Sequence, residues 1–205
     1  SNELVALMGP AGAGKTTMMM CLNGYAQPTQ GFSRMNGQDL YKHYESFRGN
    51  IGYVPQDDII HKDLTVFEAL YYTAKLRLPP DTTDGEIDRR ITRLLGDLDI
   101  EEARDVIIGD GTPERMGISG GQRKRVNLCQ ELLTEPDVLF LDEPTSGLDH
   151  INTRKVMHIL RNLADNGRVI VLTIHQPAEE FYDLTDNLLL LNTGGKLAYY
   201  GHSQQ

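Results

Sequence analysis

A glycine-rich segment near the start of the chain constrains the fold more than any other stretch of the sequence. Residues 9–17 read Gly-Pro-Ala-Gly-Ala-Gly-Lys-Thr-Thr and fit the phosphate-loop pattern G-x-x-x-x-G-K-S/T at every fixed position. The apolar run Glu3–Met8 before them has the length of a strand, and the run Met18–Leu22 after them consists of good helix formers. This order predicts the first strand, loop and helix of a phosphate-loop α/β fold.

The residues of this loop have the chemistry that a nucleotide phosphate requires. Glycine lets the backbone turn tightly, so that successive N–H groups and the positive end of the following helix converge on phosphate oxygens. Lys15 would place a point charge on the β- and γ-phosphates, and the Thr16 hydroxyl would ligate Mg²⁺. The predicted phosphate-binding residues are Gly9, Pro10, Ala11, Gly12, Ala13, Gly14, Lys15, Thr16 and Thr17.

Composition and charge restrict the class of protein. The chain has 205 residues, 40% of them hydrophobic, which is enough to bury a sizeable core. The net charge of −9 is spread along the chain, so we expect no nucleic-acid partner. Cys21 and Cys129 are too few for a disulfide framework or a zinc site, and we expect two buried free thiols. No apolar run approaches the ~18 residues that span a bilayer.

The pattern changes to helical between residues 61 and 136. Thr65–Leu76 has helical periodicity, and Asp84–Leu98 carries apolar residues at three- and four-residue spacing, as an amphipathic helix does. Proline and glycine interrupt the stretch too often for a long coiled coil. We therefore expect a helical subdomain at 61–136, inserted into an α/β core formed by residues 1–60 and 137–205.

A second glycine pair lies within the helical stretch, where Ser119, Gly120, Gly121 and Gln122 precede a predicted helix. Ser119 is a natural N-cap, and the glycines expose the backbone at the helix N-terminus. This end is therefore an anion site of the same physical kind as the first loop. A cap of this kind is by itself more often structural than functional, and one terminal phosphate has no obvious need for two such sites.

Two carboxylates follow the four apolar residues Val138–Leu141. A continuous apolar strand belongs in the centre of a parallel sheet, and its carboxyl end opens where such sheets bind ligands. Asp142 can hold Mg²⁺ there, directly or through water. Glu143, one residue further, can reach an attacking water as general base. Paired acids often only terminate a strand, but after a phosphate loop they predict a catalytic pair.

Gln56 and His175 also stand just beyond predicted strands, Ile51–Val54 and Arg168–Ile174. Taken alone, Gln56 has the position of an ordinary surface residue. An isolated histidine at a strand end is more often a hydrogen-bonded structural residue than a catalytic one. Beside a γ-phosphate, however, His175 could donate to the charge that develops there.

The remaining strand patterns complete the predicted sheet. Gly31–Gly37 is typical of a short strand closed by an Asn-Gly turn, and Asn187–Asn192 with Lys196–Tyr200 predicts a hairpin at the sheet edge. The expected fold is α/β, with a mainly parallel central sheet, a small antiparallel β part and the inserted helical subdomain.

The ordered motifs together resemble the nucleotide-binding domain of ATP-binding cassette (ABC) proteins, over essentially the whole chain. The resemblance implies an ABC ATPase fold that binds ATP with Mg²⁺ and hydrolyses ATP. It assigns Walker A to Gly9–Thr17, the Q-loop to Gln56, the signature to Ser119–Gln122, Walker B to Val138–Glu143, the D-loop to Ser146–Asp149 and the switch histidine to His175. The implied catalytic residues are Glu143, His175, Gln56 and Lys15, and the implied metal ligands are Thr16, Gln56 and Asp142.

The amino-acid sequences of six segments are similar to those of the G subfamily, the White-type pigment and lipid exporters, and of their bacterial relatives. The segments concerned are Val54–Asp58, Leu64–Val66, Leu76–Pro79, Gly121–Val126, Asp142–Asp149 and Ile174–Pro177. This resemblance implies a domain at the cytoplasmic face of a membrane that works with a transmembrane domain, expected on the same polypeptide. The exported molecule would be selected by those membrane segments.

The resemblance also implies a partner of the same kind. In ABC domains the signature faces the phosphate loop of a second copy, so a head-to-tail homo- or heterodimer buries two ATP molecules. Ser119, Gly120, Gly121, Gln122 and Asp149 would then contact the ATP that the other copy holds. This arrangement would explain why one chain carries two anion sites.

One departure and three alternatives accompany the resemblance. ABC domains usually stack adenine on an aromatic residue upstream of Walker A, but this chain begins only a few residues before the loop, so we expect an N-terminally truncated β part. A DNA-repair or translation ATPase would show a coiled-coil or zinc-bearing insertion. A regulatory module would hold ATP without cleaving it. A small-molecule kinase would share the phosphate loop but would not need residues 119–122.

Overall fold

The chain folds into two compact units, which are described separately. The computed structural model describes residues 2–175 and 179–203. Unit 1 comprises residues 1–56, 136–144 and 160–205, and unit 2 comprises residues 57–135 and 145–159. Unit 2 thus contains most of the expected helical stretch and also residues 145–159, which the sequence analysis assigned to the α/β core. The functional division into a core and a helical subdomain stays a prediction.

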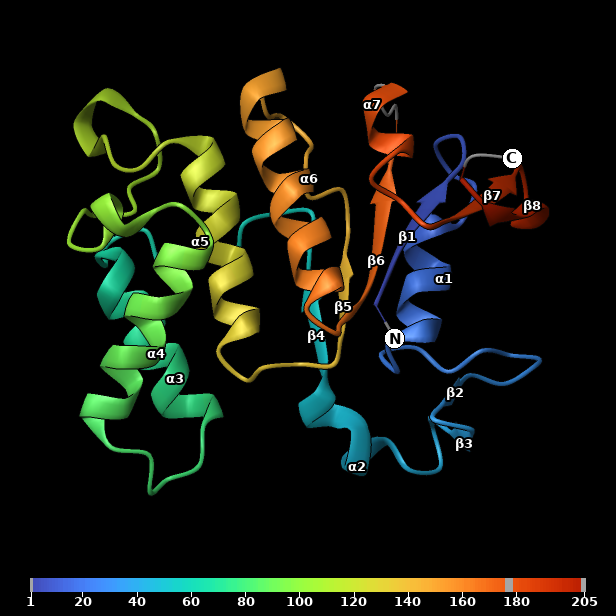
Figure 1. Ribbon diagram of the computed structural model, residues 1–205, viewed down its shortest axis with the longest axis horizontal. Coiled ribbons are helices and arrows are strands. Elements are labelled where there is room, and N and C mark those ends of the chain that lie inside the picture. Colours follow the sequence, from blue (N-terminus) through green and yellow to red (C-terminus); the bar gives the residue numbers. More distant parts are fainter. Residues whose placement is uncertain (1, 176–178, 204–205) are drawn as a thin grey trace. The chain divides into compact units, whose positions relative to one another are not determined.

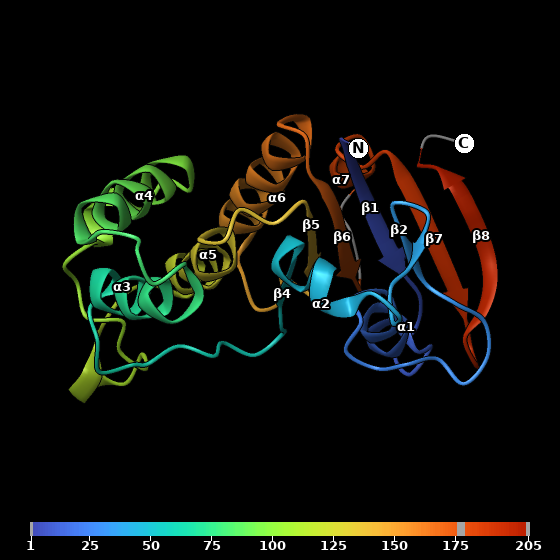
Figure 2. The same ribbon diagram turned by 90° about the horizontal axis from the view of Figure 1, so that it is seen from below.

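Unit 1 is built on a six-stranded sheet in the order β4-β5-β6-β1-β7-β8, which Figure 2 shows with the strands side by side. Neighbours from β4 to β7 pair in parallel, and β8 pairs antiparallel with β7. This topology confirms the predicted mainly parallel sheet. The strands are β1 (Glu3–Met8), β4 (Ile51–Val54), β5 (Val138–Leu141), β6 (Val169–Ile174), β7 (Asn187–Asn192) and β8 (Lys196–His202).

A separate two-stranded hairpin joins β2 (Arg34–Met35) to β3 (Gln38–Asp39) in antiparallel register. Asn36 and Gly37 form its turn, with φ angles of 50° and 78°. Both residues must adopt a positive φ in this type of tight hairpin turn, and asparagine and glycine tolerate it best. The predicted Asn-Gly turn is therefore confirmed.

The central strand β5 is covered on both faces, because successive strand residues point to opposite sides of a sheet and its successive residues Leu139 to Leu141 are all buried. In β5, Leu139, Phe140 and Leu141 are at most 4% exposed. Every residue of β5 pairs with β4 on one side and with β6 on the other. A strand enclosed in this way needs apolar residues at successive positions rather than at alternate ones.

The helices of unit 1 are short, and Figure 1 shows α1 directly after the phosphate loop. The end of α6 is anchored through Arg161, which donates to Asp186 at 2.7 Å and to the carbonyl of Leu184 at 3.1 Å. Asp186 also accepts from the backbone N–H of Leu4 on β1. The helices are α1 (Lys15–Leu22), α2 (Tyr44–Phe47), α7 (Glu179–Tyr182) and the end of α6 (His150–Asp165), with the 3-10 helix η1 (Arg48–Asn50) before β4.

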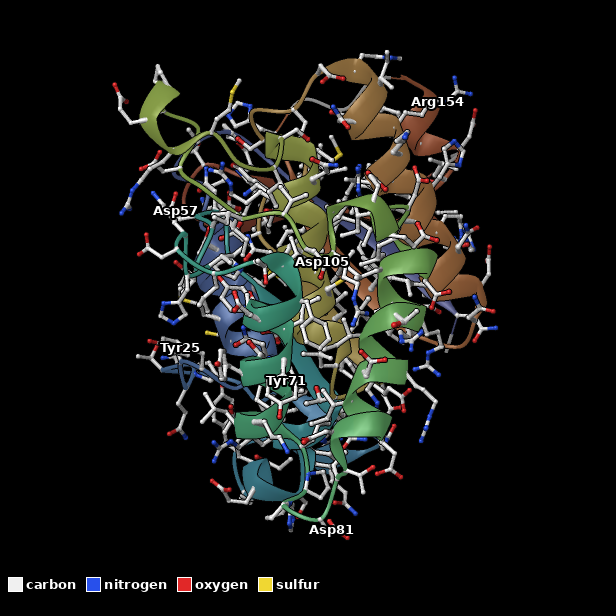
Figure 3. All side chains as sticks on the ribbon, turned by 90° about the vertical axis from the view of Figure 1, so that its left-hand side faces the viewer. Tyr25, Asp57, Tyr71, Asp81, Asp105 and Arg154 are labelled. Atoms are coloured by element: carbon white, nitrogen blue, oxygen red, sulfur yellow. The ribbon has the colours of Figure 1, made fainter. Side chains whose placement is uncertain are left out.

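Unit 2 is helical. Its elements are α3 (Val66–Arg77), α4 (Asp84–Asp97), α5 (Gly120–Leu132), the start of α6, and the 3-10 helices η2 (Glu101–Ala103) and η3 (Pro113–Arg115). Figure 3 shows α3 and α4 side by side, with Tyr71 on α3 and Asp81 in the segment that joins the two helices. Thr65, Thr83 and Ser119 each cap a helix in a capping box, which fixes where α3, α4 and α5 begin.

The core of unit 2 follows the predicted amphipathic stripe. On α4, the apolar residues at three- and four-residue spacing are all at most 4% exposed. They are Ile87, Ile91, Leu94 and Leu95.

Cys129 on α5 is a buried free thiol, as expected, and its burial raises the pKa of that thiol. The same expectation was wrong for Cys21, which is free but only partly buried, because it lies near the exposed end of the short helix α1.

A search of the described residues for membrane-spanning helices finds none that combines the length and the apolar character needed to cross a bilayer.

Leu139→Ala tests the importance of the buried strand β5. Leu139 is fully buried, so its truncation should leave a cavity and lower the free energy of unfolding by about 2–5 kcal/mol. Urea unfolding followed by circular dichroism measures the change. The control is Leu197→Ala on β8, where the side chain is 62% exposed and the change should stay within about 0.5 kcal/mol. Equal effects of the two substitutions would contradict the assignment of the core.

Candidate nucleotide-binding site

The phosphate loop connects β1 to α1, as the sequence predicts. Gly9 leaves β1 with a φ of 151°, and a Cβ there would lie 2.5 Å from the carbonyl oxygen of Leu191 on β7. Gly14 has a φ of 88° and stands at the N-cap of α1. Larger residues would be excluded at Gly9 by β7 and strained at Gly14 by the left-handed backbone. These two glycines therefore fix both ends of the loop.

Lys15 is held inside this loop. Its side chain comes from the first residue of α1 and is largely buried. The ammonium group donates to the carbonyl oxygens of Gly9 at 2.9 Å and of Pro10 at 3.2 Å. The loop thus wraps around a single positive charge, at the helix end where backbone N–H groups favour anions.

A hollow of about 350 Å³ adjoins the loop. It is lined by Gly12, Ala13, Gly14, Thr17, Met18, Cys21, Leu191, Gly194 and Gly195. The last three residues belong to β7 and to the turn that leads into β8, and the sequence analysis treated them only as a hairpin. Their glycine pair signalled the turn, but only the parallel pairing of β1 with β7 brings that turn beside the phosphate loop.

Asp142 and Glu143 follow β5 and are joined through Thr173, a residue of β6. The Thr173 hydroxyl donates to Asp142 Oδ1 at 2.6 Å and accepts from the backbone N–H of Glu143 at 2.7 Å. Thr173 is fully buried, and Asp142 is 4% exposed. The sequence analysis missed Thr173, although a single hydroxyl in an otherwise apolar strand, two residues before His175, was an available signal.

Glu143 has an unusual backbone conformation. Its φ of 47° lies in the left-handed region, which costs a non-glycine residue of order 1–3 kcal/mol. Its carboxylate accepts from Gln56 Nε2 at 3.0 Å, and the structure therefore brings together two residues that lie 87 positions apart. Such strain persists only where surrounding contacts enforce it, and it is common at functional sites.

The negative charge of Asp142 affects the pKa of Tyr53, a residue of β4. Burial, and then the charge of Asp142, raise the pKa of Tyr53. Mg²⁺ prefers hard oxygen ligands, and it usually takes one or two carboxylates together with substrate phosphates. The hydroxyl of Thr16, the amide of Gln56 and the carboxylate of Asp142 fit that preference. In the part of the chain that the structure describes, no group of three or more His, Cys, Asp or Glu residues could hold a metal.

His175 stands directly after β6 and is exposed. Among residues 2–175 and 179–203, no hydrogen bond joins it to another predicted site residue. Gln176 and Pro177, which contributed to the resemblance to the G subfamily, lie outside the described residues.

The predicted second anion site lies in unit 2, at the start of α5. Ser119 Oγ accepts from the backbone N–H of Gln122 at 3.2 Å, while Ser119 donates its own N–H to the Gln122 side chain at 2.9 Å. Gln122 Nε2 also donates to Glu102 at 2.9 Å. Gly120 is exposed, with no atom near its missing side chain, whereas Gly121 is buried. The cap is therefore firmly built around an open backbone position.

Asp149 lies in the same unit and caps the start of α6. Its carboxylate accepts from the backbone N–H of Asn152 at 2.9 Å and from the Asn152 side chain at 2.6 Å. These bonds from Asn152, first the backbone one and then the side-chain one, hold the pKa of Asp149 below its usual value. Asn152, which the sequence analysis did not single out, also packs against Gly121.

The comparisons with known proteins all find ABC transporter proteins. The family model described as ABC transporter matches residues 1–146. The chain is 45% identical over 202 residues to an ABC transporter ATP-binding/permease protein of Mycobacterium tuberculosis, covering 98% of this chain and 22% of that protein. It is 42% identical over 202 residues to ABC transporter G family member 28 of Arabidopsis thaliana, covering 98% and 18%.

A solved structure has the same fold. It is cbiO1 from Clostridium perfringens, part of the ABC transporter complex cbiONQ. It aligns with a TM-score of 0.83 at 26% identity and covers 99% of this chain and 78% of its own. The curated relatives are much longer, since this chain spans about a fifth of the length of the two named above.

Thr173→Val tests the junction between Asp142 and Glu143. Valine keeps the shape of threonine but leaves two buried polar partners unsatisfied, so the free energy of unfolding should fall by about 1–3 kcal/mol. Nucleotide hydrolysis should fall roughly 10- to 100-fold, because the carboxylate of Asp142 and the backbone of Glu143 lose the hydroxyl that holds them both. Urea unfolding and a hydrolysis assay measure the two effects, with Thr193→Val at an exposed position as control. Unchanged hydrolysis in Thr173→Val would show that the junction has no functional role.

Proposed function

The chain belongs to the ABC transporter family, and we propose that it is the ATP-binding and ATP-hydrolysing domain of an exporter similar to the G subfamily. One observation carries the proposal. The predicted site residues of unit 1 lie at or just beyond the carboxyl ends of neighbouring parallel strands. Lys15 lies in the phosphate loop that follows β1. Gln56, after β4, bonds to Glu143 after β5, and Thr173, near the end of β6, bonds to Asp142. Parallel strands present those ends at one edge of a sheet, where ligands bind.

The phosphate loop would hold the β- and γ-phosphates of ATP. Backbone N–H groups from Gly12 to Thr17 and the positive end of α1 favour the phosphate charge. Lys15 would exchange its bonds to the loop carbonyls for phosphate oxygens. Thr16, Gln56 and Asp142 would hold Mg²⁺, which supplies charge stabilisation for the transferred phosphoryl group when it is bound.

Glu143 would act as general base toward the attacking water. Its strained backbone and its bond from Gln56 fix where the carboxylate points, and a fixed base contributes mainly by being in position before the reaction begins. Thr173 would keep Asp142 and Glu143 in register with each other. His175 would donate to the charge that develops on the γ-phosphate.

The proposed partner is a second ABC domain in a head-to-tail homo- or heterodimer. In this arrangement Ser119, Gly120 and Gly121 of one copy would bind the γ-phosphate held by the loop of the other, and Gln122 and Asp149 would lie at the same interface. The exposed backbone of Gly120 at the start of α5 supports this role.

Transport would need a transmembrane domain as a further partner, expected on the same polypeptide. We place the ATPase at the cytoplasmic face of that membrane, where it would couple ATP-driven dimerisation to export. Support comes from the relatives, whose names describe ABC transporters and whose length this chain covers only in part. The acidic net charge of −9 argues against a nucleic-acid partner.

Glu143→Gln tests the hydrolytic step. The amide cannot accept a proton, so ATP should still bind while turnover falls by about 100-fold or more. Steady-state hydrolysis and a nucleotide titration separate the two properties. Glu114→Gln, in the exposed 3-10 helix η3, should leave both unchanged, and chelating Mg²⁺ should stop hydrolysis in the unaltered protein. Full turnover in Glu143→Gln would remove this residue from the mechanism.

A concentration series tests the dimer. If two copies complete each ATP site, specific ATPase activity should rise with protein concentration and then level off as dimers saturate. Sedimentation in the presence of ATP, with Glu143→Gln to prevent turnover, should show the dimer over the same concentrations. Constant specific activity from a protein that sediments as a monomer would refute the head-to-tail arrangement but not the nucleotide site.

A further inference from the structure

Gly121 packs against a side chain from another helix of unit 2. It is buried in the first turn of α5, and a Cβ there would lie 2.6 Å from Asn152 Oδ1 and 2.7 Å from Asn152 Cγ. Real Cβ atoms do not come so close to a neighbour, so alanine would displace Asn152. Glycine at this position therefore makes room for one specific side chain on α6.

The same side chain is held from its other side by Asp149. Asn152 donates its backbone N–H to Asp149 Oδ1 at 2.9 Å and its side-chain N–H to Oδ2 at 2.6 Å. Both carboxylate oxygens are thus used on one residue, and the two bonds fix the rotamer of Asn152. Hydrogen bonds to a charged group are roughly twice as strong as bonds between neutral groups.

Asn152 thus lies between two of the motifs on which the proposed function depends. The contact with Gly121 reaches the exposed backbone at the start of α5, and the bonds to Asp149 reach the loop before α6. The sequence separates these motifs by 28 residues from Gly121 to Asp149, but one half-buried amide joins them within unit 2.

We propose that Asn152 is a positioning residue that couples the loop ending at Asp149 to the anion-binding end of α5. A shift of Asp149 would move the Asn152 amide against Gly121 and so reorient the backbone of Gly120 and Gly121. The inference rests on the proposed function, in which both motifs contact the ATP held by the partner copy. Asn152 itself touches no nucleotide, so it acts on turnover through its neighbours.

The test compares Asn152→Thr with Asn152→Val, which have the same shape and differ in one hydroxyl. Threonine can still donate to Asp149, whereas valine cannot. We expect kcat to be about tenfold lower in Asn152→Val than in Asn152→Thr, corresponding to one lost charge-assisted bond. The KM for ATP should differ less between the two variants than kcat does, because the phosphate loop in unit 1 is unchanged and only the contact from the partner copy is altered. Equal kcat values in the two variants would overturn the proposal.

A second set of variants keeps the test decisive if valine at position 152 prevents folding. Gly121→Ala should lower kcat because its Cβ displaces Asn152, and adding Asn152→Ala should lower kcat little further, because both substitutions break the same contact. Additive losses would contradict the coupling. Asn162→Ala, an exposed asparagine on the same helix, serves as matched control, and thermal unfolding of every variant separates misfolding from lost coupling.

Failure of this inference can be told apart from failure of the proposed function. An unaltered protein that binds ATP but never hydrolyses it would refute the ATPase proposal itself, and with it the coupling in turnover. An unaltered protein that hydrolyses ATP, and loses activity in Glu143→Gln but not in Asn152→Val, would refute only the role of Asn152.

Discussion

The candidate site depends on the parallel hydrogen-bond ladder that joins β4, β5, β6 and β1. Parallel pairing aligns the carboxyl ends of strands that are far apart in the sequence. Each of these four strands leads into a predicted site residue, and β6 also contains Thr173. Parallel strands in the centre of a sheet are usually buried on both faces, so mostly apolar runs precede the polar residues. Core packing and site geometry therefore have the same physical origin.

Polar contacts then refine what the ladder brings together. Thr173 is fully buried, its hydroxyl bonds to both Asp142 and Glu143, and it pairs in register with Leu7 of β1. A buried carboxylate is costly unless it is hydrogen-bonded, so Asp142 and Thr173 stabilise each other. The strained backbone of Glu143 is enforced by these same contacts, and the orientation of this carboxylate is thus a property of two strands together.

In unit 2, helix capping rather than strand pairing positions the predicted site residues. Here helix ends are fixed by capping side chains, and Ser119 at the start of α5 and Asp149 before α6 each satisfy backbone N–H groups that no helix can satisfy internally. The caps also decide which groups stay open, since Gly120 keeps its exposed backbone while Gly121 receives the Asn152 side chain. The cap at Asp149 therefore also affects α5, because the Asn152 side chain that it holds packs against Gly121.

The elements that depend on local chemistry could be predicted from the amino-acid sequence. Glycine and lysine spacing gave the phosphate loop, apolar runs gave the buried strands, and Ser119 gave the start of α5. Tertiary structure alone decided which separate residues meet: Thr173 with Asp142, the β7–β8 turn with the phosphate loop, and Asn152 with Gly121. The reason is physical, because backbone propensity and periodicity act over a few residues, whereas these contacts follow from the order of strands in the sheet and from the packing of helices.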